Sequence, residues 1–125
     1  MSKAEVWLAF LTERQFSPES LPGGEIRFTV DENVFVLHPE PDDASYFKLS
    51  FYHVWDKDQP AASHELLEEL NMKVKCVKLW VQADVLCVTC EAFYADATQA
   101  TAMFDRYMTQ IYGAVQVIQA GHFPD

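Results

Sequence analysis

Five short segments of this chain have the two-residue alternation or the apolar content typical of strands, and this pattern constrains the fold most. They cover residues 25–30, 34–38, 46–55, 74–82 and 85–94. A period of two places successive side chains on opposite faces, so each segment predicts a β-strand. Asp31-Glu32-Asn33 and Ala83-Asp84 are short links between such segments, and each predicts an antiparallel hairpin.

Three other segments have the apolar spacing of helices. They are residues 3–16, the residues after Ser63, and residues 97–119. Ser63 and Asp96 stand where N-cap residues are expected. The predicted element order is α-β-β-β-α-β-β-α, which is an α+β fold with an antiparallel sheet and helices mainly on one face. The length of 125 residues fits a single domain spanning residues 1–125.

The formal net charge of −10 limits the possible partners. Nucleic-acid binding depends mainly on basic residues that displace counterions from phosphates, so we expect no nucleic-acid partner. Anionic membranes are disfavoured for the same reason. No apolar run approaches the roughly 20 residues of a membrane span. An acidic surface favours a basic partner, although net charge also serves simply to keep a protein dissolved.

The compartment is expected to be the cytoplasm. The first residues become amphipathic at once and lack the apolar core of a signal peptide. An odd number of cysteines is a poor disulfide framework for a secreted protein, and this chain has Cys76, Cys87 and Cys90.

The middle of the chain carries a resemblance to known proteins. Residues 66–71 read Leu-Leu-Glu-Glu-Leu-Asn and are followed by the paired runs 74–81 and 85–90. This helix ending in Leu-Asn before a hairpin resembles the YbjN-like proteins, and the element order resembles that of type III secretion chaperones. The resemblance implies a small, acidic, homodimeric protein that binds other proteins as a chaperone or a regulator, and it implies no catalytic motif. The chain departs from the YbjN pattern at Ala83-Asp84, where an Asp-Gly turn is usual.

Cysteine and histidine are the residue types of this chain that most often carry redox, metal or acid–base chemistry. Cys87 and Cys90 lie three apart within a strand, so they point to opposite faces and are too distant for a disulfide. A zinc site would require Cys76 to face Cys87 across the hairpin, with His53 on a neighbouring strand. His53 with a nearby acid is the alternative candidate for the base of an enzyme. We expect instead no catalytic residue, no metal and no cofactor.

The segments near the hairpin carry large apolar residues on both faces, although a sheet packed on one side should be polar on the other. Such an excess predicts either a thick aromatic core or an interface with another protein. A symmetric homodimer would pair the same patch from two copies. The predicted dimer-interface residues are Trp80, Cys87, Thr89, Met108 and Tyr112.

The function predicted from these features is non-enzymatic protein binding, to a second copy and to an unidentified protein. The predicted anchors for that protein are Trp7, Phe10, Leu11, Phe28 and Phe35. An acidic rim is expected around them, formed by Asp31, Glu32, Glu40, Asp42 and Asp43. The alternative is a small-molecule-binding domain with an aromatic-lined pocket between the sheet and the long C-terminal helix.

Overall fold

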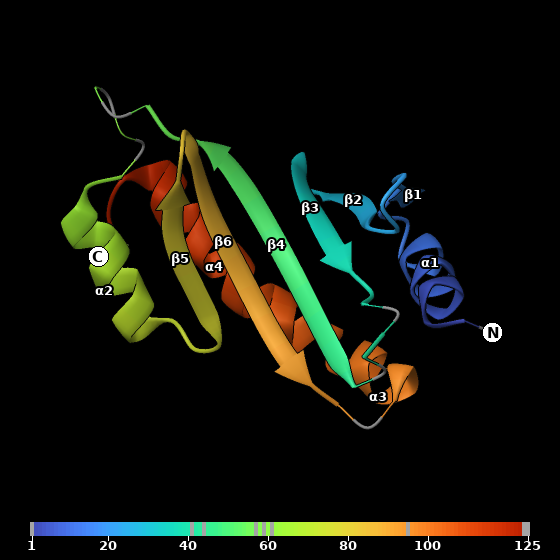
Figure 1. Cartoon of the computed structure of the whole chain (residues 1–125). Coiled ribbons are helices and arrows are strands. Elements are labelled where there is room, and N and C mark those ends of the chain that lie inside the picture. Colours follow the sequence, from blue (N-terminus) through green and yellow to red (C-terminus); the bar gives the residue numbers. More distant parts are fainter. Residues whose placement is uncertain are drawn as a thin grey trace. The chain divides into compact units, whose positions relative to one another are not determined.

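The computed structural model describes residues 2–40, 42, 43, 45–56, 58, 60, 62–94 and 96–123 (Figure 1). The chain divides into two compact units. Unit 1 contains Met1–Ser50 and Glu91–Asp105, and unit 2 contains Phe51–Cys90 and Arg106–Asp125. That residues 1–125 form one domain stays a prediction.

The strands form one sheet in the order β1-β2-β3-β4-β6-β5. They are β1 (Glu19–Ser20), β2 (Ile26–Val30), β3 (Asn33–His38), β4 (Tyr46–Val54), β5 (Val77–Gln82) and β6 (Val85–Phe93). The sheet is antiparallel, which confirms the predicted α+β class. Strand β1 was not predicted, because residues 17–24 have the prolines and glycines of a loop. Its register places Glu19 opposite Arg27, and the two side chains form an ion pair.

In unit 1, α1 (Lys3–Glu13) packs against β2, on the apolar face that β2 shares with β3. Register explains that face, because Ile26 lies opposite Leu37 and Phe28 lies opposite Phe35. The helix begins with a capping box in which Ser2 and Glu5 exchange hydrogen bonds with each other's backbone N–H. Its buried residues are Trp7 and Leu11.

In unit 2, α2 (His64–Lys73) lies beside β5. Helix α4 (Phe104–Ala120), which belongs to unit 2 from Arg106 on, runs behind β5 and β6 in the view of Figure 1. Ser63 is the N-cap of α2, as predicted, and accepts a hydrogen bond from the Leu66 N–H at 3.1 Å. The buried side chains of the two helices and the hairpin include Leu66, Leu67, Leu70, Val77, Leu79, Leu86, Val88, Ile111, Val115 and Ile118. Among them, Val77 and Leu79 lie two residues apart in β5, and Leu86 and Val88 lie two apart in β6, so these four share the inner face of the hairpin.

The last helical segment differs from its prediction. Asp96 is its N-cap, accepting from the Gln99 N–H at 2.8 Å, but the helix divides into α3 (Ala97–Ala102) and α4 at Met103. The Met103 N–H donates to both the Ala100 and Gln99 carbonyls, which tightens the last turn of α3. The apolar spacing continues across this break, so the sequence pattern could not reveal it.

Strand β5 begins at Val77 rather than at the predicted Val74. Val74 is the C-cap of α2, and its N–H donates to the Leu70 carbonyl at 2.9 Å. Cys76 has a φ of 64°, a left-handed conformation that interrupts an extended chain. Residues 74–76 therefore form the end of α2 and the turn after it, although their side chains predicted a strand.

The hairpin turn contains a strained alanine that offers a stability test. Gln82 pairs with Val85, so Ala83 and Asp84 form a two-residue turn, and Ala83 has a φ of 53°. Glycine adopts such a φ without steric cost and is preferred at the first position of a type II′ turn. We expect Ala83→Gly to raise the free energy of unfolding by about 0.5 kcal/mol, measured by urea denaturation. A lower urea midpoint for this variant would contradict the turn geometry.

Candidate protein-binding surface on the β5–β6 hairpin

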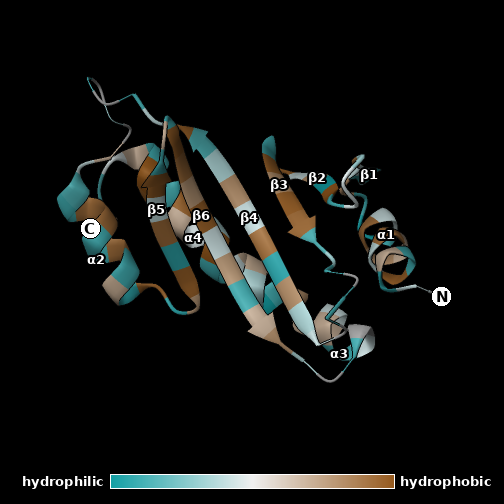
Figure 2. Ribbon diagram, in the orientation of Figure 1, coloured by the Kyte–Doolittle hydropathy of each residue, from teal (hydrophilic) through white to brown (hydrophobic). Residues whose placement is uncertain are grey.

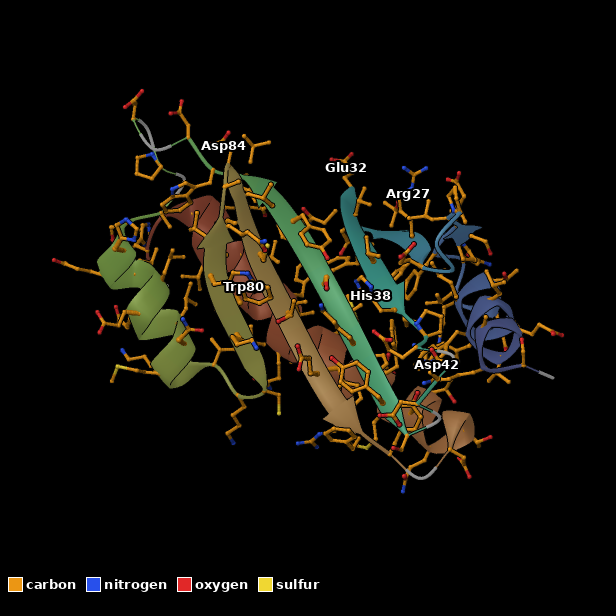
Figure 3. All side chains as sticks on the ribbon, in the orientation of Figure 1. Arg27, Glu32, His38, Asp42, Trp80 and Asp84 are labelled. Atoms are coloured by element: carbon orange, nitrogen blue, oxygen red, sulfur yellow. The ribbon has the colours of Figure 1, made fainter. Side chains whose placement is uncertain are left out.

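The β5–β6 hairpin has a second face, directed away from the buried one. The register places Lys78 opposite Thr89, Trp80 opposite Cys87, and Gln82 opposite Val85. These residues alternate with the buried ones, so they share the outer face. Figure 3 shows Trp80 on the side of β5 that faces the viewer, with α4 on the far side.

The end of β4 extends this outer face. The Trp55 N–H donates to the Asp84 carbonyl at 2.8 Å. Antiparallel pairing continued from that bond places Val54 opposite Val85 and Tyr52 opposite Cys87. We define the hairpin face as the following unit 2 residues: Tyr52, Val54, Lys78, Trp80, Gln82, Val85, Cys87 and Thr89.

Three large apolar side chains of the hairpin face are open to solvent. Val54 is 77% exposed, Tyr52 44% and Val85 37%. Trp80 is half-buried. Figure 2 shows that hydrophobic residues alternate with polar ones along β5, whereas β6 has a longer hydrophobic run next to the turn. A cluster of exposed apolar residues on a sheet face is typical of a surface that contacts another molecule.

The polar groups of the hairpin face are arranged around Trp80. The Lys78 ammonium lies 5.3 Å from the centroid of the Trp80 ring, within the range of a cation–π contact. Cys87 and Thr89 are buried although they lie on the outer face. The Thr89 Oγ1 atom has no hydrogen-bond partner among the described residues, which costs about 1–3 kcal/mol.

The predicted dimer-interface residues fall into two groups. Trp80, Cys87 and Thr89 share the hairpin face. Met108 and Tyr112 lie on α4 instead, where Met108 is buried and Tyr112 is half-buried. The structure therefore does not bring the two groups together on one surface.

Sequence reasoning left Tyr52, Val54 and Val85 out of the predicted interface, although they are the most open apolar residues of the hairpin face. Their alternation in the sequence was the available signal. It placed Tyr52 and Val54 on the strand face opposite Phe51, which is buried.

The predicted anchors for a protein partner lie in unit 1 and are mostly interior. Trp7, Leu11, Phe28 and Phe35 have no exposed surface. A side chain without exposed area offers nothing to a partner in this conformation, so these four residues act in the core. Phe10 is half-buried, with the Arg14 guanidinium 4.8 Å from its ring centroid. A partner contact at Phe10 stays a prediction.

The predicted acidic rim is divided between two places in unit 1. Asp31 and Glu32 form the β2–β3 turn, whereas Glu40, Asp42 and Asp43 follow the other end of β3. Figure 3 shows Glu32 and Asp42 at these opposite ends of the strand. The five carboxylates therefore do not form one rim.

The cysteines do not form the geometry that the zinc hypothesis needs. Trp80, and not Cys76, lies opposite Cys87. Cys87 and Cys90 lie three apart in β6, so they point to opposite faces, and no disulfide joins any two of the three cysteines. No group of three or more metal-ligating side chains occurs among the residues that the structure describes. That part of the chain also shows no ion pair involving His53, whose ring stacks on Phe51 at 6.4 Å.

The outer edge of β5 is closed by a side chain from α2. The Asn71 Nδ2 donates to the Leu79 carbonyl at 3.0 Å, and the Asn71 Oδ1 accepts from the Leu79 N–H at 2.7 Å. Asn71 thus makes both bonds that a neighbouring strand would make to Leu79. Since β5 is the last strand of the sheet, this contact protects an edge that could pair with another chain.

Comparisons with known proteins identify the type of fold. No protein-family model matches the chain, and no curated protein sequence matches it. The fold is that of the YbjN and secretion-chaperone type, which confirms the predicted resemblance. One similar structure is YbjN from E. coli, proposed as a transcription regulator, at 14% identity and a TM-score of 0.65. The match covers 93% of this chain and 88% of YbjN.

A second similar structure is the Yersinia pestis type III secretion chaperone SycH in complex with a stable fragment of YscM2. The identity is 15% and the TM-score 0.51, with 87% of this chain and 99% of SycH covered. At these identities the likeness establishes the fold alone. Separately, the helices of the described residues include none with the length and apolarity needed to span a membrane.

Proposed function

We propose that the chain is a non-enzymatic protein-binding module of the chaperone or regulator type, and that it forms a homodimer through the hairpin face. The observation that carries this proposal is the outer face of the hairpin, with Val54 at 77% and Tyr52 at 44% exposure beside Trp80 and Val85. Burying exposed apolar area stabilises an assembly by about 25 cal/mol per Å². The cytoplasm is the proposed compartment.

A second copy is the simplest partner for this surface. The exposed part of the hairpin face is apolar, since Tyr52, Val54 and Val85 lie beside the half-buried Trp80, so two copies of this face can bury each other's side chains. A two-fold axis would bring the same patch from two chains together. The similar structure of SycH holds a fragment of another protein, which supports a protein partner for this fold.

Charge insertion at Val54 tests the proposed dimer. We expect the wild-type protein to sediment as a dimer at micromolar concentration and Val54→Glu to sediment as a monomer, because a carboxylate buried in an apolar contact is strongly destabilising. Met72→Glu is the matched control. Met72 is an apolar residue of the same unit with 80% exposure, but it lies on α2 and outside the hairpin face.

The control variant should remain dimeric. A monomeric wild-type protein would refute the homodimer. If Val54→Glu and Met72→Glu had the same oligomeric state, the hairpin face would not be the dimer interface. Circular dichroism of both variants checks that each is folded, since both substitutions are at exposed positions.

The small-molecule alternative has less support. The cavities of the described structure include one of about 330 Å³ in unit 1 and one of about 410 Å³ beside α4 in unit 2. No aromatic side chain is among the described residues that line either cavity. The cavity beside α4 is lined by residues of that helix and by His122, so it is not the predicted pocket between sheet and helix.

A further inference from the structure

Unit 1 contains a cavity that the hairpin face does not involve. Its volume is about 330 Å³, at the lower end of the range of ligand pockets. Three segments that are distant in sequence line it: the start of α1, the loop before β2, and the end of β3 with the residues after it. The lining residues are Ser2, Lys3, Ala4, Gly23, Gly24, Glu25, His38, Pro39 and Glu40.

The cavity combines apolar walls with two carboxylates. Ala4, Pro39 and the two glycines supply walls without charge. The Glu25 carboxylate folds over Gly23, since a Cβ atom at Gly23 would lie 2.7 Å from both Glu25 oxygens. Neither Glu25 nor Glu40 forms an ion pair with a described residue. His38 lines the same cavity, and although burial lowers its pKa overall, the charges of Glu25 and Glu40 oppose that shift.

The two basic side chains that line the cavity are Lys3 and His38, and neither is well placed to bind an anion. The Lys3 Nζ donates to the Asp43 carbonyl at 2.9 Å, to the Tyr46 carbonyl at 2.5 Å and, at 3.4 Å, to the Glu40 carbonyl. An ammonium has three N–H donors, so these contacts leave none for a bound anion. Burial, followed by the charge of Lys48, lowers the pKa of His38 from its ordinary value, which favours the neutral imidazole.

We infer that this cavity binds the side chain of an arginine or lysine from a partner protein. The apolar walls match the methylene stem of such a side chain, and Glu25 and Glu40 match its cationic head. An acidic ligand would face two carboxylates and no available donor from Lys3. The inference adds to the proposed function that the protein partner carries a basic side chain. It rests on the proposed function in one respect, namely that this side chain belongs to a protein.

The test is an NMR titration of the ¹⁵N-labelled full chain with Nα-acetyl-arginine methylamide. We expect amide shifts at Gly23, Gly24 and Glu25, and none at Trp80. The neutral probe Nα-acetyl-norleucine methylamide, which has a similar stem without the charge, should bind at least about tenfold more weakly, as expected for loss of a charge-assisted hydrogen bond. Equal binding of the two probes, or no shift near Gly23, would overturn the inference.

Variants with matched charge complete the experiment. Glu25→Gln should weaken binding of the arginine probe about threefold to tenfold. Glu32→Gln removes the same charge from the same unit at the β2–β3 turn, outside the cavity, and should leave the affinity unchanged. An equal loss in both variants would show only a general charge effect and would overturn the site.

The titration is repeated on Val54→Glu to separate the two proposals. Val54 lies in unit 2, whereas all described lining residues belong to unit 1. The cavity should bind the probe in this variant as in the wild type, whether or not the hairpin face forms a dimer. If the arginine probe does not bind the cavity, the proposed homodimer through the hairpin face is therefore not contradicted.

Discussion

Replacement of Trp7 by alanine is expected to lower the free energy of unfolding by about 3–5 kcal/mol. Trp7 has no exposed surface, and its ring stacks on Phe47 at 5.3 Å and contacts Phe104 at 5.9 Å. Truncation would leave a large cavity among these rings, which the core can fill only partly. Urea denaturation followed by circular dichroism measures the loss.

Trp7→Phe is the informative control, because it retains an aromatic ring. The Trp7 indole N–H has no hydrogen-bond partner among the described residues, so its removal offsets part of the lost packing. We expect a loss well below that of the alanine variant. Wild-type stability of the Trp7→Ala variant would contradict the buried position of Trp7. If this stable variant also failed to bind a protein partner, Trp7 would be a surface anchor, as the sequence predicted.

Asn71→Ala is expected to cost about 2 kcal/mol of stability, because it removes two hydrogen bonds to the Leu79 backbone at about 1 kcal/mol each. The variant should also self-associate, since an open strand edge is a template for pairing. Urea denaturation measures the first effect, and sedimentation velocity over a concentration series measures the second.

Met72→Ala is the control for this experiment, because Met72 is the next residue of α2 and is 80% exposed. It should change neither stability nor association appreciably. A stable Asn71→Ala protein without added association would show that Asn71 does not protect the edge of β5.

The strands were largely predictable because their signal is local. Alternation identified the cores of β2 to β6, and the short links predicted both hairpins. The registers come from the structure, in which Asn33 of the predicted link pairs with Val30 and Gln82 pairs with Val85. Features set by backbone conformation were not visible in the side chains. The break at Met103 lies inside a continuous apolar stripe, and strand β1 depends on a register with Arg27 that only the folded sheet provides.

The candidate surface was predictable in part. The excess of apolar residues near the hairpin was evident from the sequence, and Trp80 was among the predicted residues. The sequence could not separate aromatic residues of the core from those of a surface, because Phe28 and Tyr52 are both apolar residues within strands. Burial separates them, since Phe28 has no exposed surface and Tyr52 is 44% exposed. That difference depends on which sheet face the helices cover.

Site-specific photo-cross-linking from position 54 tests the central claim most directly. Benzoyl-phenylalanine in place of Val54 should join the chain covalently to a second copy, at residues of β5 or β6 identified by mass spectrometry. The same cross-linker in place of Met72 should yield no such product. A wholly monomeric product from position 54 at micromolar concentration, with unchanged folding, would contradict the claim that another chain covers the hairpin face.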